Sequence, residues 1–209
     1  MWSRLTRITE PSDPAVSLSD AKAHLRVDHD AEDALIEALV KSATAMIDGP
    51  DGIGFALQEQ AWRVTLDGFH MFDWMVRPIA SRERWDGRAD ERIRIALRPV
   101  VSVDAVTYVD TAGDEQTLPD TDYRVSIAGG VATITPVNSW PTVKDEPGAV
   151  RIDFTAGEGT PDALRAAILL MVGHLYENRQ GVVTGTIATE LPLAWDAIVS
   201  RYRSGMISA

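Results

Sequence analysis

The sequence predicts an α+β protein, in which helices from the two ends of the chain pack as a small bundle and an antiparallel β lobe is inserted between them. Three observations lead to this prediction. Apolar residues recur at helical spacing near the N-terminus, alternate with polar residues through the middle, and return to helical spacing near the C-terminus. The 209 residues are enough to bury a core of moderate size.

The first part, residues 1–55, is predicted to hold an N-terminal arm and two helices. Two prolines interrupt residues 1–16, which should be extended, and Ser17 or Ser19 can cap the short helix that follows. A longer helix is expected over 31–48, with acidic residues at its N-terminus. Its apolar stripe consists of Leu35, Ile36, Leu39, Val40, Ala43, Met46 and Ile47.

The second part, residues 56–156, is predicted to be the antiparallel β lobe. Apolar and polar residues alternate over 62–66 and again over 93–97, as is typical of half-buried strands. Turn residues at 112–114 and a glycine pair at 129–130 separate further short strands.

The third part, residues 157–180, is predicted to be a core helix that starts just after Pro161. It is apolar nearly all round, so it should be buried, either in its own fold or between subunits. Its main stripe consists of Leu164, Ile168, Met171, Val172 and Leu175.

The last part, residues 181–209, is predicted to be a mobile loop followed by a C-terminal helix. The loop has two glycines and no helical period. The helix is indicated by an apolar stripe at spacing i, i+3, i+4 and i+7, formed by Trp195, Ile198, Val199 and Tyr202.

Composition excludes several classes of function. There is no cysteine, which excludes disulfides, thiolate metal sites and cysteine nucleophiles. The net charge of -11 does not attract a nucleic-acid backbone to the chain as a whole. No apolar run approaches the roughly 20 residues that cross a bilayer, and the N-terminus lacks a signal peptide, so we expect a soluble protein without a membrane partner.

One pair of residues on the core helix could carry chemistry. His174 and Glu177 are three residues apart and therefore share a helix face, as two metal ligands or a base and its orienting acid would. A metal site needs a third ligand, which the sequence does not show, so a structural histidine is the favoured interpretation. A metal-dependent enzyme stays an alternative, and we predict no catalytic residue, metal site or cofactor.

The stretch 77–98 is the one basic region of the chain, with seven arginines against four acidic residues. It could be a long solvated loop, a contact surface for a protein partner, or a DNA-binding module that includes Arg92. The candidate subunit or tail interface consists of Arg82, Arg84, Trp85 and Arg88.

Five stretches, taken in their order and spacing, resemble the head–tail connector (adaptor) proteins of long-tailed bacteriophages and of the related gene transfer agents. They are residues 16–48, 60–69, 98–125, 147–180 and 191–203. The Arg-rich segment at 77–92 has no counterpart in this pattern.

The resemblance implies a structural, non-enzymatic role at the head–tail interface of a virion or particle, for a protein made in the bacterial cytoplasm. Members form a ring beneath the portal protein, typically of twelve copies, which extends the DNA channel. The implied partners are further copies of the chain, the portal and a tail-side completion or stopper protein, and DNA passes through without sequence-specific binding. An acidic chain suits such a channel.

The resemblance also implies that the C-terminal segment docks onto the portal. Removal of residues 191–209 is then expected to leave a folded protein that no longer joins the portal. The candidate portal-binding residues are Trp195, Ile198, Arg201, Tyr202 and Arg203.

Overall fold

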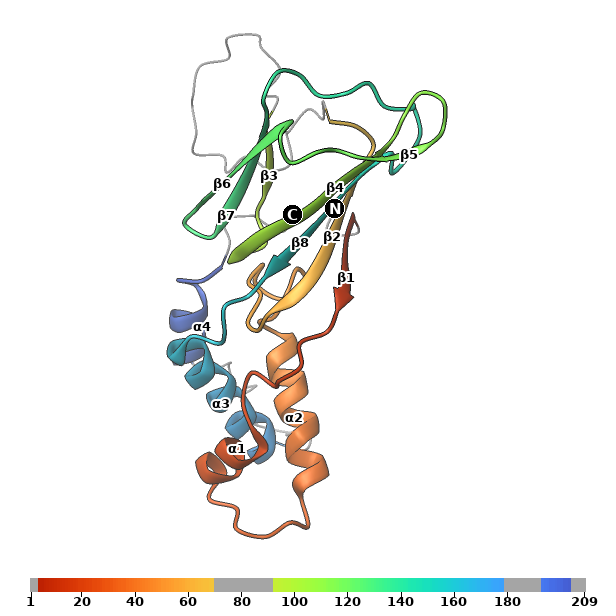
Figure 1. The fold of residues 1–209 in the computed structure, drawn as a ribbon. Coiled ribbons are helices and arrows are strands. Elements are labelled where there is room, and N and C mark those ends of the chain that lie inside the picture. Colours follow the sequence, from red (N-terminus) through yellow and green to blue (C-terminus); the bar gives the residue numbers. More distant parts are fainter. Residues whose placement is uncertain (1–3, 70–91, 179–192, 204–209) are drawn as a thin grey trace, which may run out of the picture.

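The computed structural model describes residues 4–69, 92–178 and 193–203. Within these residues the chain forms an elongated molecule with helices at one end and sheets at the other (Figure 1). The mixed α+β class predicted from the sequence is confirmed. The helices come from both ends of the chain, and most of the strands come from its middle.

The helical end contains four helices in the described part of the chain. Ser17 rather than Ser19 caps the first of them, because its hydroxyl oxygen accepts a hydrogen bond from the backbone N–H of Asp20 at 3.1 Å. The helices are α1 (Leu18–Leu25), α2 (Asp33–Ala45), α3 (Asp162–Glu177) and α4 (Leu193–Val199).

The acidic run before α2 is neutralised by a lysine of α1. The Lys22 ammonium donates to a carboxylate oxygen of Asp30 and to one of Asp33, each at 2.7 Å. The hydrogen bond from Lys22 lowers the pKa of Asp30. At the same end of α2, the Tyr176 hydroxyl of α3 donates to the Glu32 carboxylate. These contacts fix the crossing of α1 and α3 over α2.

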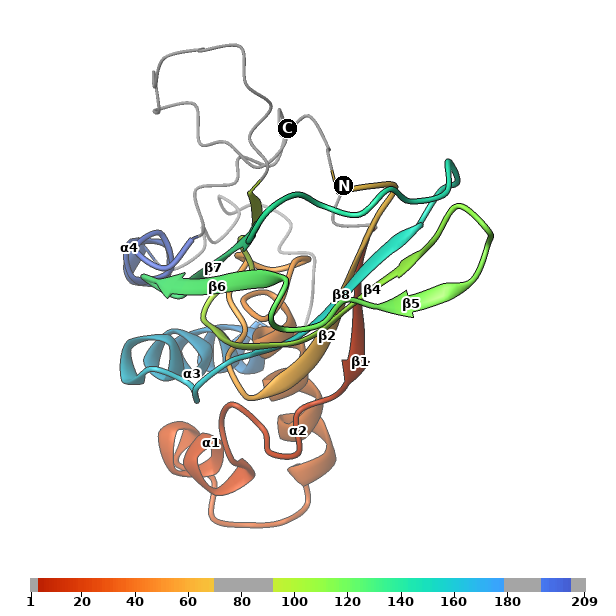
Figure 2. The same ribbon diagram turned by 45° about the horizontal axis from the view of Figure 1, so that its top comes forward.

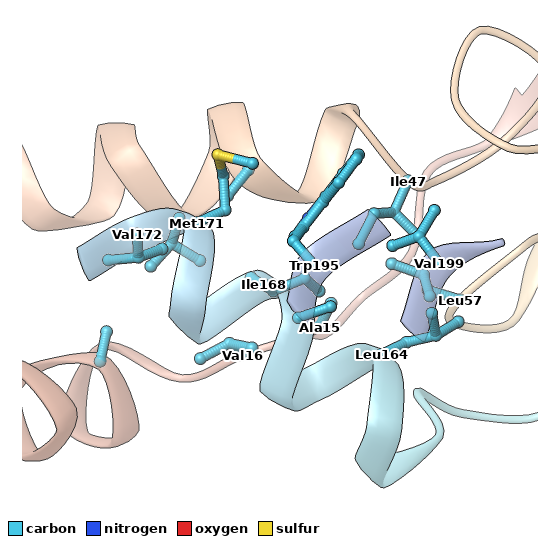
Figure 3. Close-up of a cluster of buried hydrophobic side chains, with 14 of the residues drawn as sticks. Ala15, Val16, Ile47, Leu57, Leu164, Ile168, Met171, Val172, Trp195 and Val199 are labelled. Carbon is cyan, nitrogen blue, oxygen red and sulfur yellow. The ribbon is translucent and has the colours of Figure 1, made fainter. Parts of the chain in front are cut away.

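A single apolar cluster joins the helices (Figure 3). From α2, the side chains of Ile36, Val40 and Ala43 are buried in this cluster. The predicted stripe of α2 is wider than the part that the bundle covers, since Leu35 remains 36% exposed and Met46 41% exposed. The stripe of α3 is buried at Leu164, Ala167, Ile168, Met171 and Val172.

The sheet end consists of two antiparallel sheets in the described residues, as predicted for the β lobe. The five-stranded sheet has the order β1-β2-β8-β4-β5, and the three-stranded sheet has the order β3-β7-β6. The strands are β1 (Leu5–Thr9), β2 (Gln60–Leu66), β3 (Ile93–Ile95), β4 (Val100–Val109), β5 (Glu115–Thr117), β6 (Tyr123–Ala128), β7 (Val131–Pro136) and β8 (Val150–Ala156).

The predicted N-terminal arm is a strand of the five-stranded sheet. Residues 5–9 form β1, which pairs antiparallel with β2 and makes one edge of the sheet (Figure 1). The extended conformation expected for the arm is present, but residues 5–9 lie with the β lobe, whereas Ala15 and Val16 at the end of the arm are buried in the apolar cluster of the helices. Pairing with β2 satisfies backbone groups that an isolated arm would leave to water.

One carboxylate connects the helical end to the sheet end. Asp48, just after α2, accepts hydrogen bonds on Oδ1 from the Leu57 backbone N–H at 2.9 Å and from the Gln60 amide at 3.0 Å. Its Oδ2 accepts from the Arg7 guanidinium at 2.7 Å. The Arg7 guanidinium also lies 4.7 Å from the ring centroid of Trp62 on β2, within cation–π range. Asp48 therefore holds β1, β2 and the end of α2 in one arrangement.

The chain passes from β8 to α3 through a crowded turn at Gly157. Its φ is +97°, and a Cβ atom there would lie 1.9 Å from the Gln58 carbonyl oxygen. Its N–H donates to the Pro99 carbonyl at 2.8 Å. Only glycine accommodates both this backbone conformation and this close approach.

A separate carboxylate shapes the turn between β4 and β5. Asp110 Oδ1 accepts hydrogen bonds from the backbone N–H groups of Ala112, Gly113 and Asp114, at 2.9, 3.0 and 3.0 Å. Its Oδ2 accepts from the Gln116 amide at 2.9 Å. The bond from Gln116, followed by those from the backbone, holds the pKa of Asp110 below its usual value of 3.8.

Replacement of Asp48 by alanine should lower the free energy of unfolding by about 3 kcal/mol, because its buried partners lose a charged acceptor. The side chain of Asp48 is only 9% exposed. The matched control is Asp51→Ala, which removes an exposed carboxylate from the same loop and should change the stability by less than about 0.5 kcal/mol. Urea unfolding followed by circular dichroism measures both. Equal effects in the two variants would contradict the central role of Asp48.

A fall in pH should lower the free energy of unfolding, in part because Asp110 becomes protonated. Its folded-state pKa lies below its unfolded-state value of 3.8, so its stabilisation is complete above that value and is lost as the pH falls through the folded-state pKa. The melting temperature of Asp110→Ala should therefore fall less than that of wild type between about pH 5 and pH 2. Asp114→Ala, which leaves these hydrogen bonds in place, should follow wild type. If the melting temperatures of Asp110→Ala and wild type fall equally with pH, Asp110 does not contribute to the loss of stability in acid.

Candidate functional site

The C-terminal helix α4 packs against α3 at the helical end of the molecule (Figure 1). Trp195 is 6% exposed and Val199 is fully buried, and both belong to the same apolar cluster as Leu57 and Leu164 (Figure 3). Ile198 and Tyr202 are half-buried against this cluster. The predicted apolar stripe of α4 therefore exists, and it faces the interior of its own subunit.

Two residues from the middle of the chain fasten the end of α4. The Arg98 guanidinium donates to the Tyr202 carbonyl oxygen at 3.1 Å. The rings of Phe55 and Tyr202 meet edge to face, with centroids 5.6 Å apart and an interplanar angle of 89°. Neither Arg98 nor Phe55 was singled out from the sequence, where no periodic pattern links them to α4.

The surface that α4 leaves available to a partner is polar and small. Among the candidate portal-binding residues, Arg201 and Arg203 are exposed, and so are Asp196 and Ser200 before them. Trp195, in contrast, could reach another protein only if α4 left the bundle. The five candidates thus lie together, but they divide into a buried set and an exposed set.

The His174–Glu177 pair lies on α3, with His174 half-buried and Glu177 exposed. A Cβ atom added at the neighbouring Gly173 would lie 3.5 Å from the imidazole Nε2 of His24, so α1 packs closely against this part of α3. Among the described residues, no group of three or more His, Cys, Asp or Glu side chains could hold a metal ion. The metal-enzyme alternative therefore has no third ligand in this part of the chain.

The Arg-rich candidates Arg82, Arg84, Trp85 and Arg88 lie outside the described residues, so their predicted role stays a prediction. Of the basic stretch, the described part begins at Arg92 and continues into β3. Arg98, at its end, is the arginine that holds the end of α4.

The comparisons with known proteins agree with the resemblance found in the sequence. A family model described as "Phage gp6-like head-tail connector protein" matches residues 15–63. This match covers α1, α2 and the start of β2, and so includes the first of the five stretches that carry the resemblance. No curated protein matches the chain.

Several solved structures share the fold over nearly the whole chain. A chain in the neck of an empty gene transfer agent particle computed with C6 symmetry has a TM-score of 0.70 at 24% identity. A chain from the virion of a native gene transfer agent particle has the same values. A chain in the neck of a native particle computed with C12 symmetry has a TM-score of 0.64 at 20% identity. Each match covers 98% of this chain and 96% of the other.

None of the helices in the described ranges is both long enough and apolar enough to cross a membrane.

The buried position of α4 changes the expected result of C-terminal truncation. Removal of residues 191–209 would uncover the apolar cluster at Leu57 and Leu164, so we now expect this variant to be strongly destabilised rather than normally folded. The point variant Trp195→Ala should lower the free energy of unfolding by about 3 to 5 kcal/mol.

The matched control is Ala197→Ser, an exposed position on the same helix that should change the stability by less than about 0.5 kcal/mol. Chemical unfolding of the three variants gives the comparison. A truncated chain with the stability of wild type would contradict the placement of α4 in the core.

Proposed function

We propose that this protein is a structural, non-catalytic connector subunit in the neck of a phage-like particle, where it joins the head to the tail. The observation that carries the proposal is the match in fold, over 98% of this chain, to chains from the neck of gene transfer agent particles. The match of residues 15–63 to a head-tail connector family model supports the same function independently of the fold.

In this proposal the subunits form a ring, and the neck structures computed with C6 and C12 symmetry support a ring of twelve copies. The net charge of -11 is consistent with a channel through which DNA passes without being held. The ring lies between the portal and a tail-side completion or stopper protein. No catalytic group or cofactor is needed for this role.

We further propose that α4 and the residues after it form the portal-side surface. Arg201 and Arg203 are exposed there and can pair with acidic groups of the portal. Trp195, Ile198 and Tyr202 serve as the internal anchor that holds this surface in place, with Arg98 and Phe55 behind them. A rigid anchor reduces the entropy lost on docking.

Binding to the portal tests this function. Purified protein is mixed with portal rings encoded by the same genome, and the complex is imaged by electron microscopy and weighed by native mass spectrometry. Wild type should add a ring of its own to one end of the portal. A double variant, Arg201→Glu with Arg203→Glu, should bind at least about 10-fold more weakly, because charge reversal at a contact is unfavourable.

The control is Lys144→Glu, which also replaces a positive charge by a negative one, but at an exposed residue of the sheet end. It should bind the portal as wild type does. If wild type binds neither the portal nor assembled particles under any condition, the proposed function is wrong. If wild type and the double variant bind equally well, the function stands and the portal-side assignment of α4 is wrong.

A further inference from the structure

The apolar face of the three-stranded sheet extends beyond the part that the subunit itself covers. On β6, Val125 stands opposite Ile134 of β7, and Ile127 stands opposite Ala132, so the four side chains share one face. Ile134 and Ala132 are fully buried, whereas Val125 is 39% exposed and Ile127 is 43% exposed. The edge of this face therefore lacks a cover among the described residues.

The exposed edge is held in a fixed shape. β6 is the outermost strand of its sheet, and β7 is its only strand partner in the described part of the chain. The turn that joins them is tied down, because the Val100 N–H donates to the Gly130 carbonyl at 2.8 Å. Arg124 is the one charged residue in the whole β6–β7 hairpin, 123–136. Edge strands that stay in solvent usually carry more charge or a proline at the edge.

A groove lies on another part of the molecule, between β1 with the segment after it and the C-terminal half of α2. It has a volume of about 760 Å³, and its accessible apolar lining includes Leu5, Pro14 and Ala45, above the buried side chains of Val40, Leu57 and Trp62. Two exposed apolar residues adjoin lining residues in the sequence: Ile8, which follows Arg7 and is 50% exposed, and Met46, which follows Ala45 and is 41% exposed. The charged groups that line the groove are the carboxylates of Glu10, Asp13, Asp48 and Asp51 and the cations of Arg7 and Lys41.

The hairpin and the groove lie on opposite flanks of the molecule. In Figure 1, β6 lies at the left of the sheet end and β1 lies at its right edge, with α2 below β1 in the helical end. In Figure 2, β6 again lies to the left of β1. A ring made of identical subunits uses a head-to-tail contact, in which two different surfaces of the chain must meet. Two uncovered apolar surfaces on opposite flanks satisfy this requirement, whereas a two-fold dimer would need one self-complementary surface.

We propose that the β6–β7 hairpin of one subunit docks into the β1–α2 groove of the next subunit in the ring. This proposal rests on the proposed function, since it takes the neighbouring copy as the occupant. Val125 and Ile127 supply the apolar contact. The hairpin brings no carboxylate to the groove, which carries four carboxylates against two cations, and its one charged residue, Arg124, lies on the strand face opposite to Val125 and Ile127.

Site-directed cross-linking tests the proposed pairing directly, since the natural chain has no cysteine. A double variant with Ile127→Cys on the hairpin and Ala45→Cys on the groove is assembled on portal rings and treated with a flexible bis-maleimide. A head-to-tail contact should give a ladder of covalent oligomers that extends beyond the dimer on a denaturing gel. The control pair, Ile127→Cys with Ala166→Cys, places the second thiol on the exposed face of α3 and should give no ladder.

Substitution gives a second measurement. Ile127→Asp should weaken ring formation about 30-fold or more, because it places a carboxylate in an apolar contact at the centre of the interface. Ser126→Asp, on the other face of the same strand, adds the same charge and should assemble normally. The melting temperatures of the two monomeric variants should agree closely.

The outcomes separate this inference from the proposed function. If wild type forms rings on the portal but Ile127→Asp assembles equally well and no ladder appears, the hairpin–groove contact is wrong and the connector function stands. If Ile127→Asp melts far below Ser126→Asp, the subunit's own chain covers Ile127 and the inference also fails. If wild type forms no ring on the portal or in particles, both proposals fail together.

Discussion

The hydrogen bonds of Asp48 are the constraint on which the relation of the two ends of the molecule depends. This carboxylate binds Arg7 on β1, the backbone of Leu57 and the amide of Gln60 on β2. The loop that it holds carries Phe55, whose carbonyl accepts from the Gly49 N–H at 2.8 Å. Phe55 in turn contacts Tyr202 at the end of α4. The position of the C-terminal helix is thus connected, through one loop, to the partly buried ion pair of Arg7 and Asp48 at the junction.

This connection would matter for the connector function proposed above. In the proposed connector role, the portal-side and neighbour-side surfaces proposed above would have to keep a fixed relation to each other. The groove on the β1 flank and the α4 surface both adjoin residues 48–57, so displacement of that loop would disturb both. Burial of a charged group is costly unless every partner is in place, and this cost makes the junction intolerant of partial rearrangement.

The exposed apolar side chains are consistent with the ring assembly proposed above. Large apolar side chains stay exposed on β1, α2 and β6, and two of the strands concerned are sheet edges. Such edges favour unintended pairing in a monomer. In a closed ring every edge has a neighbour, so the same features become contacts.

The candidate site could be predicted from the sequence only in part. The apolar stripe of α4 at Trp195, Ile198, Val199 and Tyr202 was visible as a periodic pattern. A periodic pattern identifies an apolar face but does not say whether the cover comes from the same chain or from a partner. In the structure, most of that cover comes from α3 and the loop before β2, so the stripe anchors the helix and leaves Arg201 and Arg203 outside. The predicted apolar stripe of α2, in contrast, stays partly exposed, because the described part of the subunit does not fully cover Leu35 and Met46.

The sequence by itself determined the α+β class, the order of helices and strands, and the resemblance to head–tail connectors, because these depend on local periodicity and on the order of motifs along the chain. Only the tertiary structure placed residues 5–9 in the sheet, paired Arg7 with Asp48, and joined Arg98 to the end of α4. Arg7 and Asp48 are 41 residues apart in the sequence, and Arg98 and Tyr202 are 104 apart. Contacts over such separations leave no periodic trace in the sequence, since they arise from the way that elements already formed pack against one another.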